Sequence, residues 1–173
     1  MEPKEVFSFC PKCGTKFNEN ENIKNCSNCG FRLYINSIPT VALVLTNKEG
    51  KVLLLKRKVE PQKDKLDLIG GFLELNETFE DAVLRECKEE IDVNVHNLKF
   101  IGTYHDRYLF NGLNYYIVSV AYSAIIEDES LIKLNNENSE FEFIDVNAID
   151  DDEFAFKSLG KIIEDFKTKF LNK

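Results

Sequence analysis

The sequence predicts an α+β fold in which a mixed β-sheet lies between helices, preceded by a small cysteine-rich unit. Three observations lead to this prediction. Four of the five cysteines fall within the first 30 of 173 residues, short strand-like runs outnumber helical segments after them, and the first two runs form an antiparallel hairpin. We expect the cysteine-rich unit at residues 1–37 and the α+β domain at residues 38–173.

The cysteine-rich unit contains two Cys-x-x-Cys pairs that are each followed by glycine, and 12 residues separate them: Cys10, Cys13, Cys26 and Cys29. Four thiolates at this spacing suit one tetrahedral Zn²⁺ ion. Two disulfides are the alternative, but the chain shows no secretory signal and is expected in the reducing cytoplasm. Because cysteine fills every position, we expect a structural zinc site with no place for a catalytic water.

Apolar periodicity gives the elements of the α+β domain. A helix is expected from Thr78 to Ile91, because Phe79, Val83 and Cys87 recur every four residues, with Thr78 as N-cap. The pair Gly70-Gly71 before it is interpreted as a turn. Strands are expected at 41–45, 52–55, 98–104, 115–126 and 141–146, and a terminal amphipathic helix at 154–170.

Composition argues against several classes of function. With 22 basic and 30 acidic residues, the net charge is −8 and the pI about 4.9, which argues against nucleic-acid or membrane binding by net field. No apolar run is long enough to span a membrane. Two histidines are too few for a multi-histidine metal site.

Glutamates at three positions of the expected helix give the strongest chemical signal. Glu86, Glu89 and Glu90 are spaced as i, i+3 and i+4, so their carboxylates crowd one face. Such an arc favours a hard divalent cation, Mg²⁺ or Mn²⁺. A solvated acidic surface is the alternative. The arc adjoins the apolar stripe rather than opposing it, which places the carboxylates at the rim of the core.

These glutamates belong to a longer pattern that resembles the box of the Nudix hydrolase family. Five residues separate the box glycine from a glutamate, and seven more precede Arg-Glu; the matching residues are Gly71, Glu77, Arg85, Glu86, Glu89, Glu90 and Val93. The sequence departs from the pattern at Asp92, where the family has glycine. Aspartate tolerates the left-handed conformation expected there better than most residues.

The resemblance implies a role for each matching residue. Glu86, Glu89 and Glu90 would bind Mg²⁺ or Mn²⁺ with the Gly70 carbonyl, and Arg85 would orient these carboxylates through Glu77 or Glu89. The remaining candidates are a late catalytic acid, from Glu137 or Glu140, and two substrate contacts, Arg57 and Tyr108.

The implied activity is hydrolysis of a diphosphate bond in a nucleoside diphosphate linked to another group. A zinc ribbon ahead of a Nudix domain is similar to a subgroup that includes the NADH pyrophosphatases. However, those members have a recognition segment rich in Trp and Pro after the box, whereas this chain has no Trp and its last proline is Pro61. We therefore expect a small-molecule nucleotide such as ADP-ribose or a dinucleoside polyphosphate rather than NADH.

Two further classes of function stay open at this point. One is a nucleotide-sensing protein that uses the fold without catalysis, although such proteins usually lose carboxylates that this chain keeps. The other is an enzyme or binding protein for RNA 5′ ends, with basic ribbon residues as contacts. The sequence is compatible with a monomer or a homodimer.

Overall fold

The computed structural model describes residues 1–18 and 21–171, which divide into two compact units. Unit 1 combines Met1–Ile38 with Arg107–Ile117, and unit 2 combines Pro39–Asp106 with the chain from Val118 onward. Unit 1 therefore joins the expected cysteine-rich region to a segment from the middle of the chain. Each unit has its own hydrophobic core.

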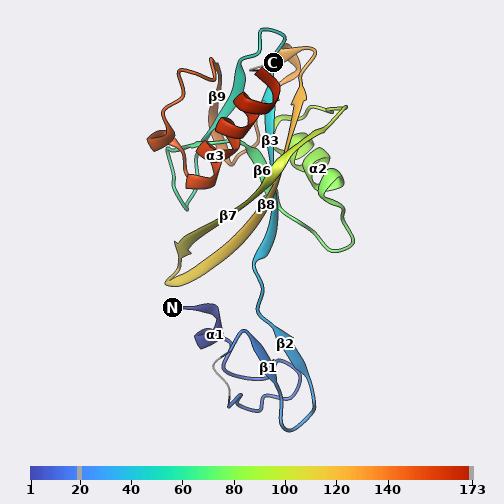
Figure 1. The fold of residues 1–173 in the computed structure, drawn as a ribbon, viewed down its shortest axis with the longest axis vertical. Helices are drawn as coiled ribbons and strands as arrows, with labels where there is room; N and C mark the ends of the chain where they lie inside the picture. The colour runs from blue at the N-terminus through green and yellow to red at the C-terminus, as the bar shows by residue number, and fades with distance from the viewer. Residues whose placement is uncertain (19–20, 172–173) are drawn as a thin grey trace. The chain divides into compact units, whose positions relative to one another are not determined.

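A mixed sheet forms the centre of unit 2 (Figure 1). The order is β5-β4-β3-β8-β7, with β6 also paired to β3 and β9 to β4. Strands β3 and β8 run parallel: Thr40 near the start of β3 is hydrogen-bonded to Ser119, and Thr46 at the end of β3 accepts a hydrogen bond from the N–H of Ile126, which follows β8. The pairs β3–β6 and β4–β9 are antiparallel. The strands are β3 (Ile38–Thr46), β4 (Val52–Arg57), β5 (Leu66–Asp67), β6 (Ile69–Phe72), β7 (Lys99–Phe110), β8 (Leu113–Ile125) and β9 (Asn138–Ile144).

Helices α2 (Phe79–Ile91) and α3 (Lys157–Phe166) lie on opposite sides of this sheet (Figure 1). Successive strand side chains point to opposite faces, so in β3 Leu43 packs toward α2 and Val44 toward α3. Both faces are covered, which explains why the first strands are continuous apolar runs. The expected arrangement of a mixed sheet between helices is confirmed.

Shorter helices follow or connect these elements: η1 (Glu129–Leu131), η2 (Asp151–Glu153) and a π-helical turn, η3 (Lys167–Leu171). The terminal helix thus begins three residues later than expected, because Phe154 lies in the α3-side core before the helix starts. No helix in the described ranges has the length and apolar character needed to cross a membrane.

Local side-chain chemistry sets both ends of α2. The Thr78 hydroxyl accepts a hydrogen bond from the Asp81 N–H at 3.1 Å, and the Asp81 carboxylate accepts one from the Thr78 N–H. At the other end Asp92 has φ +58° and its N–H bonds to the Lys88 carbonyl. Its carboxylate also pairs with Lys88, which compensates for the missing glycine. The predicted cap at Thr78 and left-handed end at Asp92 are both confirmed.

The interpretation of Gly70-Gly71 as a turn is wrong, because both residues lie within β6 and pair with β3. Close packing explains the glycines. A Cβ atom on Gly70 would stand 2.1 Å from the Val41 carbonyl oxygen, and one on Gly71 would stand 2.1 Å from a Glu86 carboxylate oxygen. Glycine is needed here for close approach rather than for backbone reversal.

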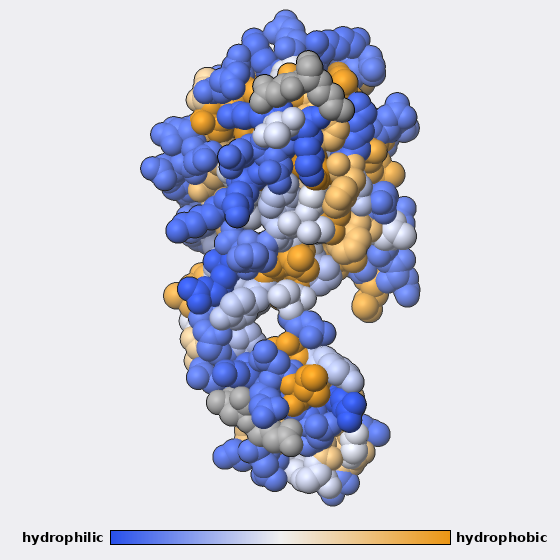
Figure 2. Space-filling model, in the orientation of Figure 1, coloured by the Kyte–Doolittle hydropathy of each residue, from blue (hydrophilic) through white to orange (hydrophobic). Residues whose placement is uncertain are grey.

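Unit 1 is built from α1 (Pro3–Val6), the antiparallel pair β1 (Ile23–Asn25) and β2 (Arg32–Tyr34), and the tip of the β7–β8 hairpin. Its core consists of Cys10, Phe17 and Cys26, with Leu33 packed beside them. The Glu2 carboxylate accepts hydrogen bonds from Asn114 and Tyr116 of the hairpin. Figure 2 shows hydrophobic side chains at the surface amid a mostly hydrophilic exterior.

Candidate active site

The box glutamates of α2 lie against β6 in unit 2. The Gly70 N–H donates a hydrogen bond to a Glu90 carboxylate oxygen at 3.2 Å, and the Glu86 carboxylate occupies the space that a side chain at position 71 would need. In an extended strand the N–H and C=O of one residue point to the same side. The Gly70 carbonyl therefore faces the same edge as Glu90.

The fit between Gly71 and Glu86 gives a testable prediction. Gly71→Ala places a methyl group where the Glu86 carboxylate lies, so we expect the Mg²⁺ concentration for half-maximal activity to rise at least tenfold. Gly160→Ala on α3 is the matched control, because the atoms nearest to its added Cβ belong to the side chain of Asp151, an exposed residue. Equal metal activation curves for Gly71→Ala and the parent protein would contradict the expected role of Glu86 as a metal ligand.

Arg85 connects the acidic residues of the box. Its guanidinium forms two hydrogen bonds with Glu77, at 2.8 and 3.1 Å, and further ones with Glu86 at 2.7 Å, Glu89 at 3.0 Å and the Phe72 carbonyl at 2.9 Å. The side chain is 22% exposed, and these acceptors raise its pKa. Arg85 therefore fixes the orientation of three carboxylates at once.

Glu90 is a strongly perturbed acid of the site. Burial raises its pKa to about 9, and the charges of Asp67 and Glu86 add to the effect. Burial likewise raises the pKa of Glu86, against the opposing effect of Arg85. Burial withholds water from the ionised form of each carboxylate, and at Glu86 the Arg85 guanidinium offsets only part of this cost.

Asp67 was not among the candidates from sequence, yet it belongs to this site. It lies on β5, accepts a hydrogen bond from Arg57 at 2.6 Å, and is close enough to raise the pKa of Glu90. Burial raises its own pKa, while Arg57 lowers it. The available signal was an aspartate flanked by leucines in Leu66-Asp67-Leu68, where a charge among buried positions needs a partner.

The two late acids lie in different places. Glu137 contributes to the raised pKa of both Glu86 and Glu90, and its carbonyl accepts a hydrogen bond from the Lys58 N–H at 2.7 Å. Glu140 instead pairs with Lys56 at 2.6 Å and lines a separate hollow of about 530 Å³ beside β4 and β9. Only Glu137 is brought to the box.

The two predicted substrate contacts belong to different units. Arg57 is held by Asp67 and by the Pro61 carbonyl at 2.8 Å, and its guanidinium lies 5.5 Å from the centre of the Phe156 ring. Tyr108 belongs to unit 1, where its ring stacks on Tyr115 with centroids 5.3 Å apart.

The donor set fits divalent cations. The site brings together six carboxylates and two guanidinium groups, which would leave an excess of four negative charges with every carboxylate ionised: Asp67, Glu77, Glu86, Glu89, Glu90 and Glu137 with Arg57 and Arg85. Oxygen ligands at high charge density are what Mg²⁺ and Mn²⁺ require. Bound cations would also remove the electrostatic cost that raises the pKa of Glu90.

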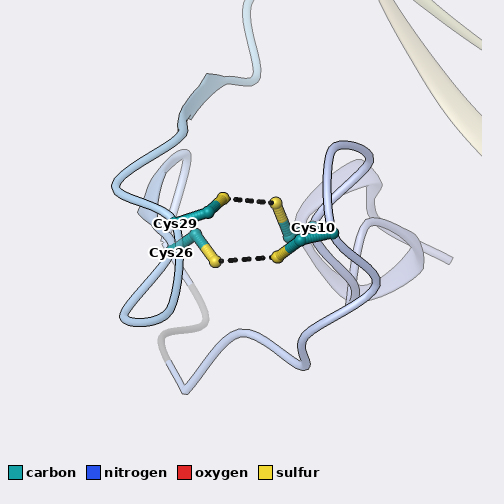
Figure 3. Close-up of side chains that lie close together, drawn as sticks. Cys10, Cys26 and Cys29 are labelled. Carbon is teal, nitrogen blue, oxygen red and sulfur yellow. Dashed lines mark hydrogen bonds between the residues drawn. The ribbon is translucent and has the colours of Figure 1, made fainter.

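The four cysteines of unit 1 form a second cluster (Figure 3). Their sulfur atoms all lie within 4.8 Å of one another, with Cys10–Cys29 at 3.7 Å and Cys13–Cys26 at 3.5 Å. These separations are far from the ~2.05 Å of a disulfide. They match the ~3.8 Å edge of a tetrahedron with Zn–S bonds of ~2.3 Å. Cys87, fully buried in unit 2, is not part of the cluster.

The fold and this site can now be compared with those of known protein families. The NUDIX domain family matches residues 37–166, so the chain belongs to the Nudix hydrolase family. The NUDIX hydrolase of Nitrosomonas europaea shares the fold with a TM-score of 0.70 and 23% identity, over 95% of this chain and 92% of that one. A MutT/nudix family protein of Enterococcus faecalis is 28% identical with a TM-score of 0.63, over 78% and 62% of the two chains.

Curated relatives are similar over the central part of the chain. The protein named NAD-capped RNA hydrolase NudC of Haemophilus influenzae (strain PittGG) is 34% identical over 103 residues, which are 57% of this chain and 39% of that protein. NudC of Pseudomonas aeruginosa (strain LESB58) is 33% identical over 97 residues, 55% of this chain and 34% of that protein. The matched region thus spans less than half the length of these relatives.

Proposed function

We propose that the protein is a divalent-metal-dependent pyrophosphohydrolase that cleaves a diphosphate bond in a nucleoside diphosphate linked to another group. The observation that carries this proposal is the excess of negative charge around Glu86 and Glu90, packed against the Gly70-Gly71 strand. A merely solvated acidic face would not hold a carboxylate whose pKa burial raises to about 9.

Each residue of the site then has a distinct task. Glu86, Glu89, Glu90 and the Gly70 carbonyl would hold Mg²⁺ or Mn²⁺, which neutralises phosphate charge and acidifies a bound water. Arg85 keeps these ligands in position through its hydrogen bonds. Glu137 is exposed and lies near Glu86 and Glu90, which supports a role for its carboxylate as acceptor of the proton of the attacking water.

The substrate class is inferred from residue types that the sequence lacks. The chain has no tryptophan, and no proline follows Pro61, so the recognition segment of NADH-cleaving relatives is lacking. This favours ADP-ribose or a dinucleoside polyphosphate. A purely nucleotide-sensing role is disfavoured, because every box carboxylate is kept and Arg85 orders three of them.

A second candidate function is hydrolysis at the 5′ end of RNA. It is favoured by one observation, the printed name of the relatives over the central region, NAD-capped RNA hydrolase. In that case the diphosphate would be part of a cap, and the same residues would act on it.

A substrate panel tests both candidates. With Mg²⁺ or Mn²⁺, we expect kcat/KM for ADP-ribose or diadenosine tetraphosphate to exceed that for NADH at least tenfold. NADH as the best substrate would contradict the argument from the missing segment. A higher kcat/KM for NAD-capped RNA than for every free dinucleotide would select the second candidate. No turnover of any diphosphate would overturn the proposed activity.

For unit 1 we propose one structural zinc ion held by Cys10, Cys13, Cys26 and Cys29, because their sulfur separations suit a tetrahedral site. Metal analysis of protein purified without added zinc is expected to give one zinc per chain. Cys26→Ser is expected to lose the zinc and unfold unit 1, because so small a core needs the metal. Cys87→Ser is the matched control and keeps it. Zinc retained in Cys26→Ser would contradict the site.

A further inference from the structure

Unit 1 contains a pocket of about 680 Å³ that neither the box nor the cysteine cluster uses. Its walls come from the α1 region, from β2 with the residues after it, and from the start of β8 at the hairpin tip. This volume lies within the range of small-ligand sites in proteins. The pocket is large enough for a nucleotide.

Four aromatic side chains line the pocket. Tyr34 is 55% exposed, Phe7 46% and Tyr116 38%. Tyr115 also lines the pocket, and its ring stacks almost parallel on Tyr108, with 9° between the planes. Exposed rings beside a fixed stacked pair offer flat surfaces for further stacking, which is how proteins hold unpaired bases.

Polar side chains that line the pocket suit the edges of a base. Asn22, Asn36 and Asn114 supply amides that can both donate and accept hydrogen bonds. The Glu2 carboxylate is already engaged by Asn114 and Tyr116. The Tyr116 hydrogen bond is the main cause of the lowered pKa of Glu2.

The charge of the protein is divided unequally between the units. Unit 1 has six basic and four acidic residues, a formal charge of +2, whereas the whole chain carries −8. A zinc ion bound by four thiolates would add −2 and leave unit 1 neutral, against −10 for unit 2. Unit 1 is therefore the part of the molecule that repels a polyanion least.

We propose that this pocket binds an unpaired base of single-stranded RNA, outside the catalytic site. Stacking surfaces, amides and the absence of strong negative charge together favour this ligand over an acidic or purely apolar partner. The choice of RNA rests on the second candidate of the proposed function. Binding itself is separable from hydrolysis, because the pocket residues lie in unit 1 and the box lies in unit 2.

Fluorescence anisotropy with a labelled single-stranded RNA of about ten nucleotides, measured on the zinc-loaded protein without added Mg²⁺ or Mn²⁺, tests the proposal. Tyr34→Ala is expected to weaken RNA binding at least fivefold through loss of a stacking surface. Phe9→Ala is the matched control, because Phe9 is 60% exposed in the same unit but does not line the pocket. It is expected to bind RNA within twofold of the parent.

Hydrolysis of free dinucleotides by Tyr34→Ala is expected to equal that of the parent, so failure of the proposed catalysis and failure of the pocket are distinguishable. The proposal is overturned if the parent does not bind single-stranded RNA, or if Tyr34→Ala binds it as tightly as the parent. It is also overturned if AMP or duplex RNA competes as well as the single strand. Loss of a dimer in Tyr34→Ala would assign the pocket to a second copy of the chain and likewise overturn it.

Discussion

Replacing Glu90 with glutamine is expected to lower kcat by 10²–10⁴ while making the metal-free protein more stable. The substitution keeps the shape of the side chain and removes a charge that the site uses to hold a cation. A metal held less tightly acidifies its water less, and losses of this order follow removal of such a group. Steady-state rates at saturating Mg²⁺ or Mn²⁺ measure the first effect.

The stability effect has a defined pH dependence. Burial raises the pKa of Glu90 to about 9 from its ordinary 4.5, so between these values the folded protein binds a proton that the unfolded chain releases. Stability is therefore highest at low pH and falls as the pH rises toward 9. Glutamine removes this loss. In EDTA-free buffer without Mg²⁺, the melting temperature of Glu90→Gln should exceed that of the parent at pH 8 and equal it near pH 5.

Glu142→Gln provides a matched control for Glu90→Gln, because Glu142 is an exposed glutamate of β9 that lines the hollow beside β4 and β9. It should change neither kcat nor the pH dependence of melting. If Glu90→Gln hydrolysed substrate within twofold of the parent rate, Glu90 would not be a metal ligand. If its melting temperature fell at pH 8, the glutamate would instead belong to a stabilising ion pair.

Features encoded by neighbouring residues could be predicted from the sequence. Helix α2 begins after Thr78 and ends at Asp92 because both caps depend on side chains within four residues. Strands β3 and β4 could be predicted because burial on both faces makes them continuous apolar runs. The four cysteines come together as two local pairs.

Features that depend on distant residues were missed or misread. The β7–β8 hairpin is longer than expected, although Asn111-Gly112, with φ +49° and +78°, is a known signal for a tight hairpin turn. The prediction of a turn at Gly71 is wrong because the constraint on this glycine, contact with the Glu86 carboxylate, comes from another element. Asp67 gained a role only through Arg57 and Glu90, whose proximity is set by the tertiary structure.

Arg85→Ala is expected to cause the largest loss of stability among the substitutions considered. It removes the partner of Glu77, Glu86 and Glu89, of which the first two side chains are only 11% and 12% exposed. Removing one member of a buried ion pair costs about 3–5 kcal/mol, because the remaining charges stay buried without compensation. For a chain of this size that corresponds to a fall of roughly 6–20 °C in melting temperature.

The ion pair Lys88–Asp92 tests whether the loss comes from the buried carboxylates around Arg85 or from a general effect of charge on the helix. It lies on the same helix, but its side chains are 51% and 42% exposed, so Lys88→Ala should cost at most about 1 kcal/mol.

Arg85→Lys keeps the charge but not the planar fork that holds Glu77 by two hydrogen bonds, and should recover only part of the stability and little of the activity. In the double variant Arg85→Ala/Glu77→Gln, the total loss should be smaller than the sum of the single losses, because no charged carboxylate remains at position 77. Additive losses would show that Arg85 stabilises the protein by packing rather than by ordering the carboxylates of the site.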